Sequence, residues 1–153
     1  MYELLRALHN LLRWLVLGGM IWALVVIYRD LFGGATWTER DRKAGVIYTG
    51  VLGLQLLLGF LLYFVGPYSV LAINDLGTAV QDVVLRFFAL EHPVQMVLAV
   101  IIAQVGYSVS KRASTDKAKF RWAAICYTLA AVLVIISIPW PFLEYGRPLF
   151  PYW

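Results

Sequence analysis

The sequence predicts an all-α protein that spans a membrane as a four-helix bundle, with both ends of the chain on the outer side. Hydrophobic residues make up 61% of the chain and charged residues only 14%, whereas a soluble domain carries about a quarter charged residues. The apolar residues gather in long segments separated by short loops. With 153 residues, the chain has room for a single domain, which we place over its whole length, 1–153.

Four apolar segments predict the membrane spans. An α-helix rises about 1.5 Å per residue, so about 20 residues cross the hydrocarbon core. The spans are expected at about 9–28, 44–65, 90–109 and 122–138. No small-residue cleavage site of the usual kind follows the first segment, so we expect it to remain as a helix and not to act as a signal peptide.

The charges of the loops predict the orientation. Loops 29–43 and 111–121 hold four and five of the 13 Lys and Arg residues, whereas the connection 66–81 holds none. Because short cytoplasmic loops collect Lys and Arg, the two basic loops are expected inside. Both termini then lie outside, in the periplasm if the membrane is a bacterial inner membrane. The net charge of +4 therefore reflects topology and does not indicate a nucleic-acid partner.

Two outer segments carry further signals. Segment 76–90 is expected to form an amphipathic helix in which Asp82 and Arg86 pair at i,i+4. Pro93 cannot donate a backbone hydrogen bond, so either this helix kinks there or the third span begins there. The tail 139–153 is too rich in proline to span and suits the interfacial aromatic belt. Its aromatic residues are Trp140, Phe142, Tyr145, Phe150, Tyr152 and Trp153.

The two histidines are the main candidates for a site. His9 lies 20 residues before Arg29, and His92 lies 19 residues before Lys111. Each therefore marks the far end of a span that finishes in a basic loop, and the two spans run in the same direction. Two imidazoles at one depth, on helices that can sit diagonally in a ring of four, are a ligand set for haem iron. The alternative is that both are ordinary polar residues at the lipid–water boundary.

Arg13 and Glu91 are candidate second components of such a site. Arg13 follows His9 by one helical turn on the same face. It lies inside the hydrocarbon, where a cation usually has a partner, and the candidates are Glu91 and the propionates of a haem. Alternatively it snorkels to the headgroups. Glu91 is expected either to accept a hydrogen bond from an imidazole or to lie solvated at the surface.

Arg86 and Gln95 complete the candidate set. Arg86 could reach a propionate, and its pairing with Asp82 is the competing explanation. Gln95 follows His92 by three residues and points toward the same core. Gly59 on the second span could leave room for a flat macrocycle, although helix packing explains a glycine there as well.

Several chemistries are excluded by missing motifs. The chain contains no CxxCH, CxxC, HExxH, P-loop or GxGxxG pattern. Covalent haem of the c type is therefore excluded, and hydrolysis and phosphoryl transfer have no support. The single cysteine, Cys126, falls within an apolar segment and is expected to pack as a small hydrophobe.

Four sequence pieces carry a family resemblance: LHNLLRW at 8–14, LRFFALEHP at 85–93, TDKAKF at 115–120 and IPWPF at 138–142. The chain resembles small bacterial four-span membrane proteins described as cytochrome b or cytochrome b-like. That resemblance implies one haem b held by His9 and His92. The architecture is also similar to haem-binding bundles of the cytochrome b561 type, but the second histidine pair of those proteins is missing.

These observations lead to a functional expectation with two alternatives. We expect an electron-transfer protein with one bis-histidine haem b near the outer face, which works with quinol or within a larger respiratory or photosynthetic complex. It is expected to be an electron carrier or redox subunit and not a stand-alone enzyme. The first alternative is a cofactor-free accessory subunit of a membrane complex. The second is a small transporter that uses Arg13, Glu91 and His92.

Overall fold

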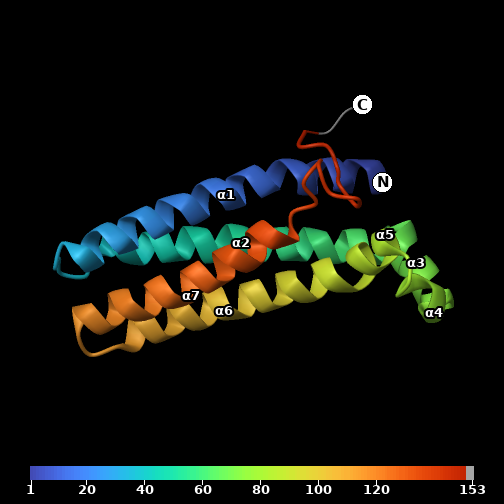
Figure 1. Cartoon of the computed structure of the whole chain (residues 1–153). Helices are drawn as coiled ribbons and strands as arrows, with labels where there is room; N and C mark the ends of the chain where they lie inside the picture. The colour runs from blue at the N-terminus through green and yellow to red at the C-terminus, as the bar shows by residue number, and fades with distance from the viewer. Residues whose placement is uncertain (151–153) are drawn as a thin grey trace.

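The computed structural model describes residues 1–150, and this part of the chain consists of helices and loops without a strand. Four long helices lie side by side (Figure 1): α1 (Tyr2–Phe32), α2 (Glu39–Val65), α6 (His92–Arg112) and α7 (Asp116–Ser137). Three of these helices, α1, α2 and α7, and the continuous helical stretch Val83–Arg112 that ends with α6, are long and apolar enough to cross a membrane. The prediction of an all-α membrane four-helix bundle is confirmed.

The helices form a ring. Neighbours in the ring are α1 with α2, α2 with α6, α6 with α7, and α7 with α1. Helices α1 and α6, which carry the two histidines, are therefore diagonal, as their common direction predicted. The α1–α2 and α6–α7 loops lie at one end of the bundle, which we call the basic end, and Met1 lies at the other (Figure 1).

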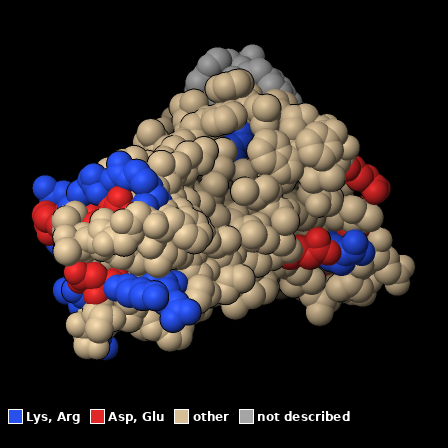
Figure 2. Space-filling view, turned by 60° about the vertical axis from the view of Figure 1, so that its left-hand side comes forward, with Lys and Arg blue, Asp and Glu red and all other residues tan. Residues whose placement is uncertain are grey.

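At the basic end, side chains cap and join the helices. The Asp41 carboxylate accepts hydrogen bonds from the backbone N–H and hydroxyl of Thr38, both at 2.7 Å, and so caps α2. At α7 the N-cap residue Thr115 accepts a hydrogen bond of 3.2 Å from the backbone N–H of Ala118 with its own hydroxyl. Asp30 of α1 is buried and pairs with Arg29 and Arg40. Most charged groups gather at the two ends of the molecule, and the belt between them is largely uncharged apart from a basic group below the grey atoms (Figure 2).

At the opposite end, short helical segments connect α2 to α6. They are α3 (Pro67–Asn74), α4 (Leu76–Ala79), α5 (Val83–Arg86) and the π-helical turn η1 (Phe87–Glu91). The prediction of one continuous helix over 76–90 is therefore wrong, because the chain turns at 80–82. Asp82 uses its carboxylate to cap α5 at the N–H of Leu85, which removes it from the predicted pairing with Arg86.

Proline explains the change of helix type before α6. Pro93 has no N–H to donate to the carbonyl of Ala89, its partner in a regular α-helix. That carbonyl instead accepts a hydrogen bond of 3.2 Å from the Tyr63 hydroxyl of α2. The helical hydrogen bonding continues through the π turn, in which the N–H of His92 bonds to the carbonyl of Phe87, five residues earlier. The result is that His92 points into the bundle.

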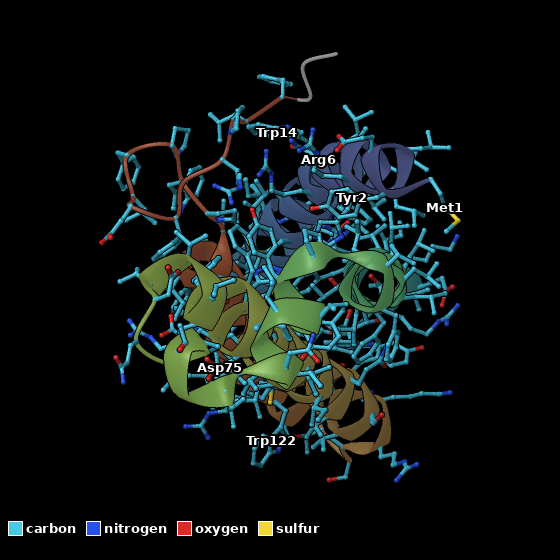
Figure 3. All side chains as sticks on the ribbon, turned by 90° about the vertical axis from the view of Figure 1, so that its right-hand side faces the viewer. Met1, Tyr2, Arg6, Trp14, Asp75 and Trp122 are labelled. Atoms are coloured by element: carbon cyan, nitrogen blue, oxygen red, sulfur yellow. The ribbon has the colours of Figure 1, made fainter. Side chains whose placement is uncertain are left out.

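The tail after α7 folds back over α1. Residues 139–150 contain no helix, which agrees with the prediction that the tail does not span the membrane. They run beside the first half of α1 (Figure 1). Trp14 and Phe150 stack with ring centres 5.2 Å apart, and Figure 3 shows Trp14 on the side of α1 near the tail. Tyr152 and Trp153, which belong to the predicted aromatic belt, lie outside the described residues.

Candidate functional site

A cavity of about 810 Å³ lies at the end of the bundle opposite the basic loops, and we call this the cavity end. It exists because α7 stops at Ser137 while α1 and α2 continue past it. Its wall comes from α1, α2, α3, η1, α6, the last turn of α7 and the tail. Its volume falls within the range of about 300–1,000 Å³ that is typical of small-molecule and cofactor sites.

His9 and His92 face each other in this wall. Their ring centres are 6.2 Å apart and their planes are inclined by 73°. An imidazole nitrogen binds a metal ion at about 2 Å and the ring centre lies about 1 Å behind it, so two imidazoles that share one iron have ring centres about 6 Å apart. A simple edge-to-face pair also has ring centres about 4.5–7 Å apart. The distance between the ring centres therefore fits both a ligand pair and an edge-to-face pair.

The tautomer of His92 is set by its neighbour on α7. Its Nδ1 lies 2.8 Å from the carbonyl oxygen of Ser137. A carbonyl only accepts, so Nδ1 carries the proton and donates, and Nε2 keeps its lone pair. A backbone carbonyl at the far nitrogen is the usual arrangement behind a metal-bound histidine. The Ser137 hydroxyl in turn donates to Gln95 Oε1 at 2.6 Å.

His9 is held from α2. A Cβ placed on Gly59 would lie 3.3 Å from Cε1 of His9, so the imidazole occupies the space that a larger residue at 59 would need. Gln55, one turn earlier on α2, donates from Nε2 to the backbone carbonyl of His9 at 2.9 Å. His9 Nδ1 and Gln55 Oε1 are both buried and have no hydrogen-bond partner among the described residues. Because the described residues offer His9 Nδ1 no acceptor, the surroundings of His9, unlike those of His92, do not fix its tautomer.

Arg13 lies in the same wall and is only 9% exposed. One of its terminal nitrogens donates to Asn10 Oδ1 at 2.6 Å and to the backbone carbonyl of Leu149 in the tail. It is therefore partnered within the protein, and neither Glu91 nor snorkelling accounts for its position. Its Nε has no acceptor among the described residues.

Three other candidates lie outside the cavity wall. Arg86 and Glu91 pair with each other at 2.7 Å, and each side chain is more than a third exposed. Glu91 therefore does not orient an imidazole, and the charge of Arg86 is already balanced by the carboxylate of Glu91. Gln95 does not contact His92. It accepts a hydrogen bond from the hydroxyl of Ser137, the residue whose backbone carbonyl binds the His92 ring.

Arg147 is the residue that the sequence reading missed. It comes from the tail and lines the cavity. Its guanidinium donates to the Tyr68 hydroxyl at 2.6 Å and lies 4.7 Å from the ring centre of Phe88. The available signal was weak: Arg147 is a single cation in a tail otherwise rich in aromatic residues and proline.

Residues 1–150 bring together no group of three or more His, Cys, Asp or Glu side chains that could hold a bare metal ion. A pair of imidazoles is the ligand set that a haem iron takes, since the porphyrin supplies the remaining ligands. Comparisons with models of known families, with curated proteins and with solved structures found no significant match.

Proposed function

We propose that the protein is a membrane electron carrier of the cytochrome b-like kind, with one haem b per chain held by His9 and His92. The observation that carries the proposal is the pair of imidazoles on diagonal helices, with ring centres 6.2 Å apart, in the wall of a cofactor-sized cavity. The resemblance of the sequence to four-span cytochrome b-like proteins supports the same assignment.

The surrounding residues fit this role. Ser137 fixes the His92 tautomer, so Nε2 is the nitrogen that binds the iron. Gln55 ties α2 to the backbone at His9. Apolar side chains such as Val16, Leu52 and Val134 line the deep part of the cavity and exclude water. When bound, haem b supplies a reversible one-electron couple. His9 and His92 would both hold the iron, and a haem held by two imidazoles would favour electron transfer over oxygen binding.

The first experiment is a reduced-minus-oxidised visible spectrum of the purified protein in detergent, with a pyridine haemochrome assay. We expect a b-type α band and about one haem per chain. His9→Ala and His92→Ala should each abolish this low-spin spectrum, whereas Gln104→Ala, on the exposed face of α6, should preserve it. A colourless wild-type protein, even when haem is supplied during expression, would contradict the proposal and favour an accessory subunit.

The proposal also states on which side of the membrane the site lies. The cavity end lies opposite the two basic loops, so the rule for basic loops places the site on the outer face, in a bacterial inner membrane. Single cysteines introduced at Gly77 and Ser114 lie at the two ends of the bundle, and the native Cys126 is buried. In intact cells, a membrane-impermeant maleimide should label only the first. Labelling of position 114 alone would reverse the orientation.

The proposed partner is a quinol from the bilayer or a larger redox complex. One haem at one end leaves most of the hydrocarbon core, about 30 Å thick, without a second redox centre, so this chain alone does not carry electrons across. Mixing the oxidised holoprotein with a lipid-soluble quinol should reduce it within seconds. Absence of reduction would exclude quinol and leave a protein donor.

A further inference from the structure

The arginines at the cavity end divide into two classes. Arg6 pairs with Glu3 at 2.5 Å and Arg86 pairs with Glu91 at 2.7 Å. Arg13 and Arg147 form no ion pair with a carboxylate of the described residues, 1–150. Arg13 and Arg147 both line the cavity, whereas Arg86 does not. The unneutralised positive charge of this end is therefore concentrated in the cavity wall.

The surroundings of Arg13 make a missing anion costly. Its side chain is 9% exposed, and its hydrogen bonds go to neutral oxygens of Asn10 and Leu149. Its buried Nε is without an acceptor. A buried cation is strongly unfavourable unless a counter-charge and complete hydrogen bonding compensate for lost hydration. The protein supplies neither in full, so a ligand with a negative group is the remaining source.

Arg147 is positioned in the same manner from the other side. Among the described residues its guanidinium contacts neutral groups: it donates to the Gly146 carbonyl at 3.0 Å and to the Tyr68 hydroxyl, and it lies over the rings of Tyr68 and Phe88. The tail that carries it is fixed in place by several contacts. Asn10 and Trp14 donate to the carbonyls of Pro148 and Leu149 at 3.3 and 3.2 Å, and the rings of Tyr145 and Phe87 stack 3.7 Å apart. The tail therefore holds a second cation at the cavity.

We propose that Arg13 and Arg147 are a pair of carboxylate-binding groups, which require the ligand between His9 and His92 to carry two acidic groups. This rests on the proposed function and deepens it, because haem b is a flat macrocycle with two propionates. It assigns the second propionate to Arg147 of the tail and not to Arg86. It also predicts that a neutral quinone is not the occupant of this cavity.

The test compares two forms of one macrocycle. Apoprotein of the full chain, in detergent free of anionic lipid, is titrated with haem b and with its dimethyl ester, in which both carboxylates are blocked. Wild-type protein should bind the free acid at least a hundredfold more tightly. Loss of one charge-assisted hydrogen bond weakens binding about tenfold or more, so Arg13→Gln and Arg147→Gln should each reduce this preference by that factor. Arg86→Gln is the matched control and should leave it unchanged.

Each outcome is informative. Equal affinities for acid and ester, with a histidine-dependent low-spin spectrum for both, would overturn the carboxylate pair and leave the proposed function intact. Equal affinities that both fall when an anionic phospholipid is added would assign the two arginines to a lipid phosphate, which also overturns the proposal. If neither haem b nor its ester gave the low-spin spectrum, the proposed function itself would be wrong. The same conclusion would follow if the spectrum persisted after both histidines were replaced. The wild-type comparison needs no substitution, so it holds even if an arginine variant fails to fold.

Discussion

The two halves of the bundle contain the same four helices but are packed in opposite ways. Toward the basic end, α6 and α7 approach closely through small buried residues, among which are Ala103, Gly106 and Ala123. Small residues let helices touch backbone to backbone, which is the usual packing device within a membrane. Toward the cavity end, α7 has stopped, and the tail and the cavity take its place.

Polar atoms show the same contrast. At the basic end, the buried carboxylate of Asp30 has two arginine partners. Of the five buried side-chain atoms without a hydrogen bond among the described residues, three belong to His9, Arg13 and Gln55, which all line the cavity. Unsatisfied groups gathered in one place are characteristic of binding sites, which natural proteins keep at some loss of stability. The half toward the basic end, which we call the closed half, therefore stabilises the fold. The half toward the cavity end, which we call the open half, is the part that we propose is specialised for a ligand.

The largest predicted effect is on the closed half. A Cβ on Gly106 of α6 would overlap the Cβ of Cys126 on α7, and neither is the end of a flexible side chain. Gly106→Leu should therefore force the two helices apart and lower the free energy of unfolding by about 3 kcal/mol, the upper part of the range for overpacking. Thermal unfolding in detergent, followed by tryptophan fluorescence, measures the change.

The control for this substitution is Gly53→Leu on α2, where a Cβ would meet no atom within 4 Å. The control should unfold within about 0.5 kcal/mol of the wild-type protein, as do most substitutions away from packed contacts. A similar loss in both variants would mean that glycine matters in these helices for a reason other than close contact.

The second effect is on binding and should leave the fold intact. In Gly59→Leu, the new side chain has the cavity to enter, so the bundle should still form. The same side chain displaces the His9 imidazole, which lies 3.3 Å from the Cβ position, and occupies ligand space. Affinity for haem b should fall at least tenfold, which corresponds to about 1.4 kcal/mol. Haem titration and thermal unfolding of one preparation separate the two quantities.

Gly50→Leu, on an exposed part of α2 with no atom near the Cβ position, is the matched control and should bind as the wild type does. If Gly59→Leu unfolds as readily as Gly106→Leu, the distinction between a closed and an open half is wrong.

The sequence was sufficient for the features that depend on local pattern. The length of the apolar segments predicted the four spans. The charge of the loops predicted that one end of the bundle is basic and the other is not. Helix limits were predicted too short, since Glu3 and Arg6 end the apolar run of α1 although they form an i,i+3 pair on a helix that continues. Hydropathy predicts only the part of a helix that lies in the hydrocarbon core, so it misses the turns that continue beyond the core.

The candidate site was predictable only in part. Distance from a basic loop placed His9 and His92 at one depth, and this required no tertiary information. Arg86 was paired with the wrong carboxylate, because the π turn brings residues five apart onto one face, and Glu91 is five residues after Arg86. Arg147 could not be placed, since the path of the tail depends on side chains of α1 that bond to its backbone carbonyls. Such bonds leave no pattern in the sequence.

The smallest predicted effect concerns the short segments at the cavity end. Asp75 caps α4, and hydrogen bonds from the hydroxyl and backbone N–H of Thr78 hold the pKa of its carboxyl below the usual value. A lowered folded pKa means that the carboxylate stabilises the cap above the unfolded pKa, about 3.9, and that this stabilisation is lost as the pH falls through the lower folded value. Amide protection in 76–79, expressed relative to the intrinsic exchange rate at each pH, should therefore fall in acid before that of α7 does. Asp75→Asn should remove this pH dependence without changing α7. Simultaneous acid opening of both segments would mean that the two halves unfold as one unit.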